Sequence, residues 1–272
     1  MYKIKRRPLK DNNSIYIVEK DNKLFVAKKL DPNLENHEFN ILNDLHHPRI
    51  VKQYGIQKIY YGSRELKDNY LILEKVFGVP IILKERPIPR ESLIGYATDI
   101  SSALSYINMK GIVHGDVSMG NVMAAKKRAK LLDFDIANRL EKEFCESRGI
   151  NFRNSPLEAW VGFYHKKTDV YSFGVLLLDC HRNNLTINVD WFIGTQIHGL
   201  IDQNWKSARD FYNDALQGKE KAMDILPLQR PENVKSVIRR RTKMRSLLEG
   251  MLEWNLDNRP SIQEVEKELL TL

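Results

Sequence analysis

The sequence contains little cysteine and no long hydrophobic run. Its two cysteines, Cys145 and Cys180, in a chain of 272 residues exclude a disulfide-rich scaffold and a four-cysteine zinc site. No apolar stretch approaches the roughly 18 residues that a membrane-spanning helix needs. The basic N-terminus, MYKIKRRPLKDNNS, lacks the apolar core of a secretory signal. We therefore expect a reducing compartment, the cytoplasm, with the nucleus or the interior of a host cell as alternatives.

The composition is that of an ordinary globular protein. Hydrophobic residues make up 42% of the chain and charged residues 29%, and the length fits one large domain or two lobes. The formal net charge of +8 favours an acidic partner, such as nucleotide phosphates, nucleic acid, a membrane surface or an acidic peptide. The basic run at 237–245, VIRRRTKMR, is more typical of a solvated face than of a nucleic-acid site.

The first third of the chain reads as strands with one helix. Ser14–Val18 and Leu24–Leu30 flank the turn dipeptide Asp21-Asn22, which predicts a hairpin. Apolar residues at helical spacing predict a helix over Asn36–Leu45. Ile50–Ile59 and Tyr70–Val76 are expected to form further strands.

The remainder of the chain is predicted to be mostly helical. A break at 77–80 precedes it, and the expected helices are Ser92–Met109, Asp169–Asp179, Arg245–Trp254 and Ile262–Leu270. Short strands are expected at Ile112-Val113 and Lys130–Leu132, around two loops. This order predicts a β-rich part joined by a hinge to a helical part.

The segment from Ile112 to Ala137 carries the most informative residues. Asp116 follows His114 in an H-x-D pattern, Asn121 stands five residues further on, and Asp133 follows in LLDFD. Phosphoryl transfer needs such a set, because one carboxylate orients or deprotonates the attacking hydroxyl while an amide and a second carboxylate hold Mg²⁺. His114 is expected to support the loop rather than to act as a base.

These motifs resemble the H-R-D-L-x-x-x-N and D-F-G motifs of the protein kinase family. The resemblance implies an α+β, two-lobed protein-kinase-like fold, with a small β-rich N-lobe at 1–76 and a larger helical C-lobe at 77–272. It also implies ATP and Mg²⁺ as cofactors, with Asn121 and Asp133 as metal ligands. Asp116 is then the catalytic carboxylate, supported by Asn121.

The same resemblance implies the residues that contact the nucleotide. Lys28 in AKKL resembles the lysine that contacts the α- and β-phosphates, and Glu38 resembles the glutamate that pairs with it. Lys29 is the alternative, since alternation along a strand places the two lysines on opposite faces. Glu74 and Val76 lie in a segment similar to the hinge whose backbone binds adenine.

Three more residues resemble structural residues of the kinase family. Asp169 is expected to brace the backbone of the catalytic loop. Arg259, in the segment DNRPS, is expected to pair with the glutamate of the A-P-E motif, for which Glu158 is the candidate. The resemblance covers roughly residues 9–270.

The sequence also departs from the family pattern. LKDNNSI at 9–15 stands in place of the glycine-rich loop, which casts doubt on nucleotide affinity. Gly115 replaces the arginine of H-R-D, Ser118 replaces a lysine, and Asp135 replaces the glycine of D-F-G. Without an arginine at 115, we expect the segment from Asp133 to Glu158 to be held by packing and ion pairs rather than by phosphate. The H-G-D string also resembles aminoglycoside and choline kinases and the small atypical kinases of the piD261/Bud32 type. The longer pattern H-x-D-[IV]-S-x-G-N, followed by D-F-D-x-A, resembles a fungal-type protein kinase group.

We therefore predict a serine/threonine protein kinase that transfers the γ-phosphate of ATP to a protein hydroxyl. The alternatives are a pseudokinase used as a binding or inhibitory module and a small-molecule phosphotransferase. The expected partners are ATP and a protein substrate, with a host protein as one candidate. No membrane partner and no nucleic acid is expected.

Overall fold

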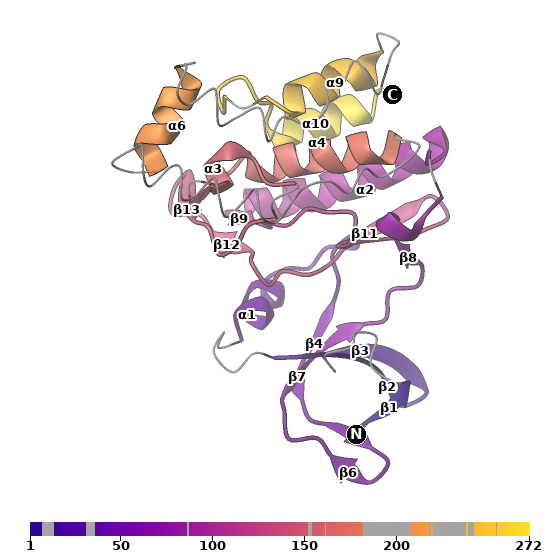
Figure 1. Cartoon of the computed structure of the whole chain (residues 1–272). Coiled ribbons are helices and arrows are strands. Elements are labelled where there is room, and N and C mark those ends of the chain that lie inside the picture. Colours follow the sequence, from indigo (N-terminus) through magenta and orange to yellow (C-terminus); the bar gives the residue numbers. More distant parts are fainter. Residues whose placement is uncertain are drawn as a thin grey trace.

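The computed structural model describes residues 1–6, 14–30, 36–85, 87–151, 154–160, 162–181, 208–217, 219, 238, 242–253 and 255–272. Among these described residues, strands and one helix form the N-terminal part, and most helices lie in the C-terminal part, as Figure 1 shows. The expected α+β, two-lobed arrangement is therefore confirmed. The replacement for the glycine-rich loop, except for Ser14 and Ile15, lies outside the described residues, and so do residues 237 and 239–241 of the basic run.

A seven-stranded sheet forms the N-lobe, in the order β4-β7-β3-β2-β1-β5-β6. The strands are β1 (Tyr2–Arg6), β2 (Ile15–Lys20), β3 (Lys23–Lys29), β4 (Gln53–Gln57), β5 (Ile59–Tyr61), β6 (Arg64–Glu65) and β7 (Tyr70–Glu74). The predicted hairpin is β2–β3, and its turn residues Asp21 and Asn22 have φ of 50° and 60°. Positive φ at both turn positions matches the twist of the flanking strands, which explains the choice of Asp-Asn.

The sheet differs from the predictions in one wrong strand, one strand that was not predicted and one strand end. Ile50–Ile59 is not one strand: β4 ends at Gln57, and β5 crosses to the other side of the sheet, where it pairs in parallel with β1. The basic N-terminus, which no pattern marked as a strand, forms β1, with Tyr2 buried against Phe25. In addition, β7 ends at Glu74 instead of Val76. Local hydropathy does not encode the edge at which a segment joins a sheet.

One helix, α1 (His37–Asn43), lies between the sheet and the C-lobe (Figure 1). Ile41 and Leu42 are buried in the main core, so this face of the helix ties the N-lobe to the rest of the chain. The helix occupies the span predicted from its periodicity, and it buries Glu38 on the same face.

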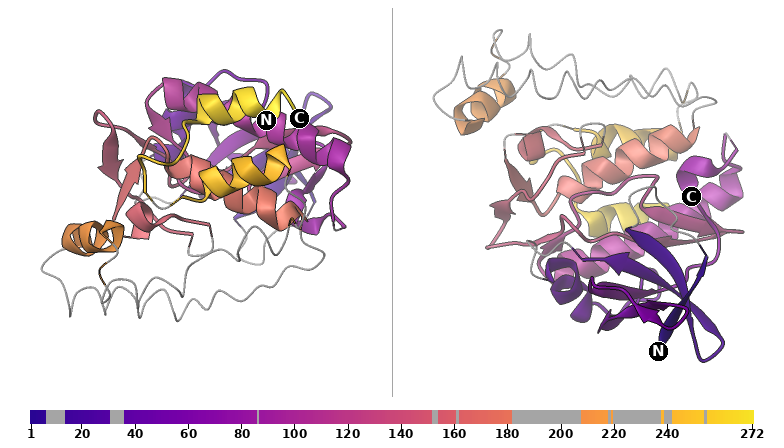
Figure 2. Two further views of the ribbon diagram at one scale, coloured as in Figure 1. Left: turned by 90° about the horizontal axis from the view of Figure 1, so that it is seen from above. Right: turned by 60° about the horizontal axis from the view of Figure 1, so that its bottom comes forward.

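The C-lobe is built on α2 (Arg90–Met109), α4 (Thr168–His181), α9 (Lys243–Met251) and α10 (Ile262–Leu269), as predicted (Figure 2). The other described helical elements are η2 (Ile81–Leu83), α3 (Leu157–Trp160) and α6 (Ala208–Leu216). Every residue of α4 from Thr168 to Cys180 is buried, which explains its apolar sequence. Gly174 allows α9 to approach, because a Cβ there would lie 3.0 Å from the Cβ of Met251. No described helix has the length and apolar character to cross a membrane.

Short strands position the loops of the C-lobe. They are β8 (Val79–Pro80), β9 (Ile112–Val113), β10 (Val122–Ala125), β11 (Arg128–Leu131), β12 (Asn138–Arg139), β13 (Phe144–Glu146) and β14 (Phe163–His165). β10 was not predicted, and it pairs antiparallel with β11, with Val122 opposite Leu131. The amide of Leu132 then donates to the carbonyl of Asn121 over 2.9 Å. Because Leu132 directly precedes Asp133, this pairing places Asn121 close to Asp133 in the fold.

Candidate active site

Lys28 lies at the centre of a cluster of three carboxylates. Its Nζ is 2.9 Å from Glu38 Oε2, 2.5 Å from Asp133 Oδ1 and 2.7 Å from Asp135 Oδ2. Lys29, one residue on, points to the opposite face and pairs at the surface with Asp68 over 2.9 Å. Of the two lysines left open by the sequence, Lys28 is therefore the one that pairs with Glu38.

The cluster changes the proton affinity of its members. Burial by itself lowers the pKa of Lys28, but Glu38, Asp133 and Asp135 outweigh it and raise that pKa above its ordinary value. Burial raises the pKa of Glu38 to about 7, helped by the two aspartates and opposed by Lys28. One ammonium faces three carboxylates, so the cluster carries excess negative charge that a cation can neutralise.

Glu38 also connects α1 to the segment that begins at Asp133. Its Oε1 accepts from the backbone amide of Phe134 at 3.0 Å, while Oε2 faces Lys28. Phe134 is fully buried and packs edge-on against His114, with ring centroids 4.6 Å apart. Asp133 itself has φ of 63°, a left-handed conformation that this packing and the Phe134 amide bond maintain.

The carboxylate of Asp116 is held by two side-chain amides. Asn121 Nδ2 donates to its Oδ2 over 2.7 Å and also to the Asp116 carbonyl over 3.1 Å. Asn151 Nδ2 donates to its Oδ1, also over 2.7 Å. The structure thus brings Asp116 and Asn121 together as the motif implied. Asn151 was not singled out in the sequence, because nothing local distinguishes it from a loop asparagine.

Asp169 braces the loop that carries Asp116, as expected. Its Oδ2 and Oδ1 accept from the backbone amides of His114 and Gly115, over 2.7 and 2.9 Å. His114 is buried and contacts the carbonyl of Leu132 through Nε2 at 2.9 Å. The predicted supporting role of His114 is therefore confirmed by its contacts. Burial raises the pKa of Asp169, and the loop amides oppose that effect.

Gly115 lies against the ring of Tyr164. A Cβ at this position would lie 2.7 Å from both Cζ and the hydroxyl oxygen of Tyr164, and Gly115 has φ of 78°. The Tyr164 hydroxyl donates to the carbonyl of Gly149 over 2.6 Å, so the aromatic ring joins the catalytic loop to the segment after Asp133. Arg139, which lies in this segment, pairs with Asp44.

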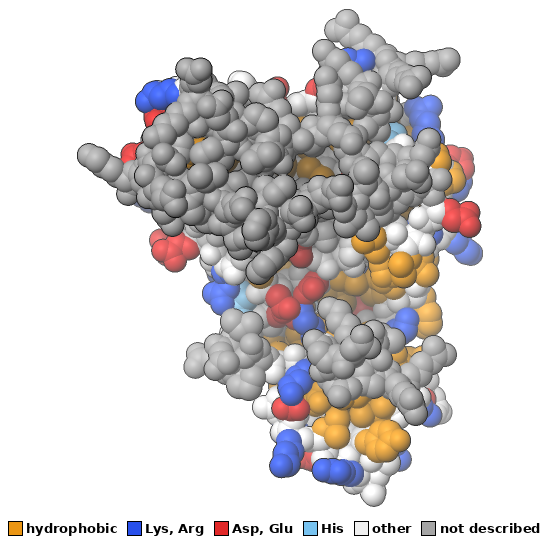
Figure 3. Space-filling model, viewed as in Figure 1, with side chains coloured by type: hydrophobic (Ala, Val, Ile, Leu, Met, Phe, Trp, Pro, Cys, Tyr) orange, Lys and Arg blue, Asp and Glu red, His pale blue; other side chains and the backbone are white. Residues whose placement is uncertain are grey.

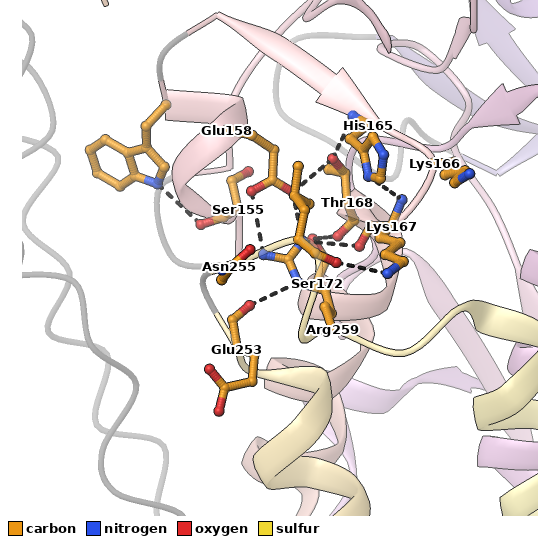
Figure 4. Close-up of polar contacts among 12 residues, drawn as sticks. Ser155, Glu158, His165, Lys166, Lys167, Thr168, Ser172, Glu253, Asn255 and Arg259 are labelled. Carbon is orange, nitrogen blue, oxygen red and sulfur yellow. Dashed lines mark hydrogen bonds and ion pairs between the residues drawn. The ribbon is translucent and has the colours of Figure 1, made fainter. Parts of the chain in front are cut away.

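Glu158 and Arg259 form the predicted pair, drawn in Figure 4. Arg259 Nη1 lies 2.6 Å from Oε1 and Nη2 lies 3.3 Å from Oε2, and both side chains are fully buried. Thr168 also donates to Glu158 over 3.0 Å, and Arg259 Nη1 donates to the Lys167 carbonyl over 3.1 Å. The extra residue in the motif at Ser155–Glu158 therefore does not prevent the pairing.

The candidate hinge follows β7. The Glu74 carboxylate pairs with Lys130 of β11, and the Glu74 amide donates to the carbonyl of Lys52 over 2.8 Å. Val76 is partly buried against the main core. The adenine contacts assigned to the backbone of these residues stay a prediction. In Figure 3, acidic side chains lie beside a basic one where the lobes meet, and hydrophobic side chains gather next to them.

A β-rich lobe and a helical lobe that meet at a lysine–glutamate pair, beside a loop aspartate, define a two-lobed kinase-like fold. A family profile described as protein kinase domain matches residues 9–270. The chain therefore belongs to the protein kinase family.

Curated relatives agree over part of the chain. The serine/threonine-protein kinase RUNKEL of Arabidopsis thaliana is 27% identical over 170 residues, covering 58% of this chain and 12% of that protein. The eIF-2-alpha kinase GCN2 of Mus musculus is 30% identical over 170 residues, or 56% of this chain and 10% of that protein. Smooth muscle myosin light chain kinase of Gallus gallus is 30% identical over 157 residues, covering 51% and 8%. The aligned part of the chain spans about a tenth of the length of these relatives.

Proposed function

We propose that this chain transfers the γ-phosphate of ATP to a serine or threonine hydroxyl of a protein. The observation that carries the proposal is the pair of contacts expected of a kinase site: Asn121 holds the Asp116 carboxylate, and Lys28 pairs with Glu38. Catalysis of this reaction is mostly positioning and charge stabilisation. The choice of serine or threonine as acceptor is supported by the name of one curated relative, the serine/threonine-protein kinase RUNKEL.

Each residue then has a defined role. Asp116 orients the acceptor hydroxyl and takes its proton. Lys28 contacts the phosphates, and Glu38 keeps its ammonium in place through the ion pair at 2.9 Å. The backbone of Glu74 and Val76 contacts adenine. Residues on both lobes contribute, so the reaction depends on how the lobes meet.

A divalent cation fits the donor set. The ligand oxygens of Glu38, Asp133 and Asp135 lie within 4.8 Å of one another, and carboxylates are hard oxygen ligands of the kind Mg²⁺ prefers. The backbone carbonyl of Asn121 accepts from the amide of Leu132, the residue before Asp133, so the side chain of Asn121 offers a further amide oxygen next to this segment. We propose that Asp133 and Asn121 hold Mg²⁺, which neutralises phosphate charge when bound.

The test is Mg²⁺-dependent transfer of labelled phosphate from ATP to the chain itself and to a generic basic protein. Asp116→Asn is expected to abolish transfer, and Lys28→Met to reduce it at least tenfold, about 1.4 kcal/mol of barrier. Lys29→Met is the matched control, because it removes the neighbouring lysine, whose partner Asp68 is at the surface. Transfer that persists undiminished in Asp116→Asn would reject the catalytic assignment.

One observation favours a second candidate, a pseudokinase that binds partners without catalysis. Asp135, which replaces a glycine, contacts Lys28 at 2.7 Å and competes with phosphate for the same ammonium. Thermal-shift measurements with ATP distinguish the candidates. The kinase predicts stabilisation that requires Mg²⁺, while a pseudokinase predicts none or a metal-independent one. Asp135→Gly is expected to increase ATP binding in either case.

A further inference from the structure

Asn151 and Asn121 approach the Asp116 carboxylate from two different segments. Each amide donates to a different oxygen, Asn121 to Oδ2 and Asn151 to Oδ1, and both distances are 2.7 Å. Asn121 is local to the catalytic loop, whereas Asn151 lies 35 residues further along the chain. One donor on each oxygen fixes the rotation of the carboxylate plane.

Both donors are neutral, which matters for the chemistry of Asp116. An ionised carboxylate offers about four acceptor positions, so two donors leave positions for an acceptor hydroxyl. Amide donors orient the carboxylate without cancelling its charge, unlike an ammonium at the same place. The sequence carries Ser118 where the family has a lysine, so the chain lacks that ammonium two residues after Asp116.

Backbone hydrogen bonds hold Asn151 in place. Its backbone amide donates to Ser155 Oγ over 3.2 Å, and its carbonyl accepts from the amides of Asn154 and Ser155 over 3.0 and 2.9 Å. Asn154 is buried, and its Nδ2 donates to the carbonyl of Val117 in the catalytic loop over 3.1 Å. Trp160 Nε1 donates to the carbonyl of Ser155 over 3.1 Å. The segment around Asn151 is therefore docked on the loop beside Asp116.

We propose that Asn151 is a positioning residue for phosphoryl transfer, which presents the Asp116 carboxylate to the acceptor hydroxyl in a single orientation. The inference rests on the proposed function. It makes the segment after Asp133 part of the catalytic arrangement through a neutral hydrogen bond, with no phosphate needed to complete it.

The first test compares Asn151→Ala with Asn138→Ala. Asn151→Ala is expected to lower kcat at least tenfold and to leave the KM for ATP within about twofold, because the nucleotide contacts lie on other segments. Asn138 is the matched control, since its side-chain amide donates to the Glu146 carbonyl over 3.0 Å in the same segment. Asn138→Ala is expected to keep its kcat within about twofold of the unaltered chain.

The second test separates positioning from a structural role. Asn151→Asp places a second carboxylate against Asp116, and two adjacent carboxylates share a proton as the pH falls. The protonated pair restores a donor to Asp116. The ratio of kcat in Asn151→Asp to kcat in the unaltered chain is therefore expected to rise about fivefold or more from about pH 8 to about pH 6.

The outcomes distinguish a failure of the Asn151 inference from a failure of the proposed function. A flat ratio across that range, or an Asn151→Ala variant with unchanged kcat, would overturn the inference while phosphate transfer by the unaltered chain upholds the proposed function. A fall in kcat of Asn151→Ala accompanied by an equal loss in Asn138→Ala would also overturn it, because general loosening of the segment would explain both. Absence of transfer by the unaltered chain would reject the proposed function and this inference together.

Discussion

Replacement of Gly115 by alanine is expected to destabilise the folded chain by about 2–5 kcal/mol. Two separate costs add. A non-glycine residue in the left-handed region, where Gly115 has φ of 78°, costs roughly 1–2 kcal/mol. The new methyl group would lie 2.7 Å from ring atoms of Tyr164, and overpacking of this kind costs roughly 1–3 kcal/mol.

A double-mutant cycle separates the two costs. Tyr164→Ala alone is expected to cost about 3–5 kcal/mol, as for other buried aromatic side chains. It also removes the ring that the methyl group of Gly115→Ala strikes. The double variant is therefore expected to lose less stability than the two single variants lose together. The difference is expected to be about 1–3 kcal/mol, which is the steric cost alone.

Urea denaturation in the absence of nucleotide is the assay, with the slopes compared to confirm that the unfolded states are alike. Tyr164→Phe is the control, because it keeps the ring and removes only the hydroxyl that donates to Gly149, at about 1 kcal/mol. Losses that add to within about 0.5 kcal/mol would refute the steric contact between Gly115 and Tyr164.

Three further predictions concern regulation, the buried ion pair and pH. Phosphatase treatment is expected to change initial transfer rates by less than tenfold, about 1.4 kcal/mol, because Gly115 offers no charge to a phosphate; a larger drop would contradict this. Glu158→Gln is expected to cost about 3–5 kcal/mol, because it leaves Arg259 buried without its anion. Glu143→Gln, at the exposed pair with Lys166, is expected to leave the urea midpoint almost unchanged, and equal shifts in the two variants would refute the prediction. Burial lowers the pKa of His165 from 6.5 to about 4, and the carboxylates of Glu158 and Glu143 only partly oppose it. The folded chain therefore takes up this proton less readily than the unfolded chain, and about 3 kcal/mol of stability is lost as the pH falls from 6.5 towards 4. His165→Asn is expected to reduce this loss of stability between pH 6.5 and pH 4. An unchanged loss would contradict the assignment of this pH dependence to His165.

The residue types and spacings of the sequence were enough to predict several parts of the site. Asp116, Asn121 and Asp133 were found from a short motif, because phosphoryl transfer restricts which side chains can serve at those places. The resemblance to the kinase family added Glu38 and a lysine at position 28 or 29. The β2–β3 hairpin and the helices α1, α2, α4, α9 and α10 were also predictable, since turn dipeptides and apolar periodicity act over a few residues.

Only the tertiary structure decided the contacts between distant segments. It showed that Lys28 rather than Lys29 faces Glu38, that Asp135 joins the same cluster, and that Asn151 reaches Asp116. It also placed Tyr164 against Gly115 and added β1, β5 and β10 to the sheets. These contacts join residues far apart in the chain, and a side chain carries no local mark of the partner that folding brings to it. Their geometry is set by the packing of whole strands and helices, which no short pattern encodes.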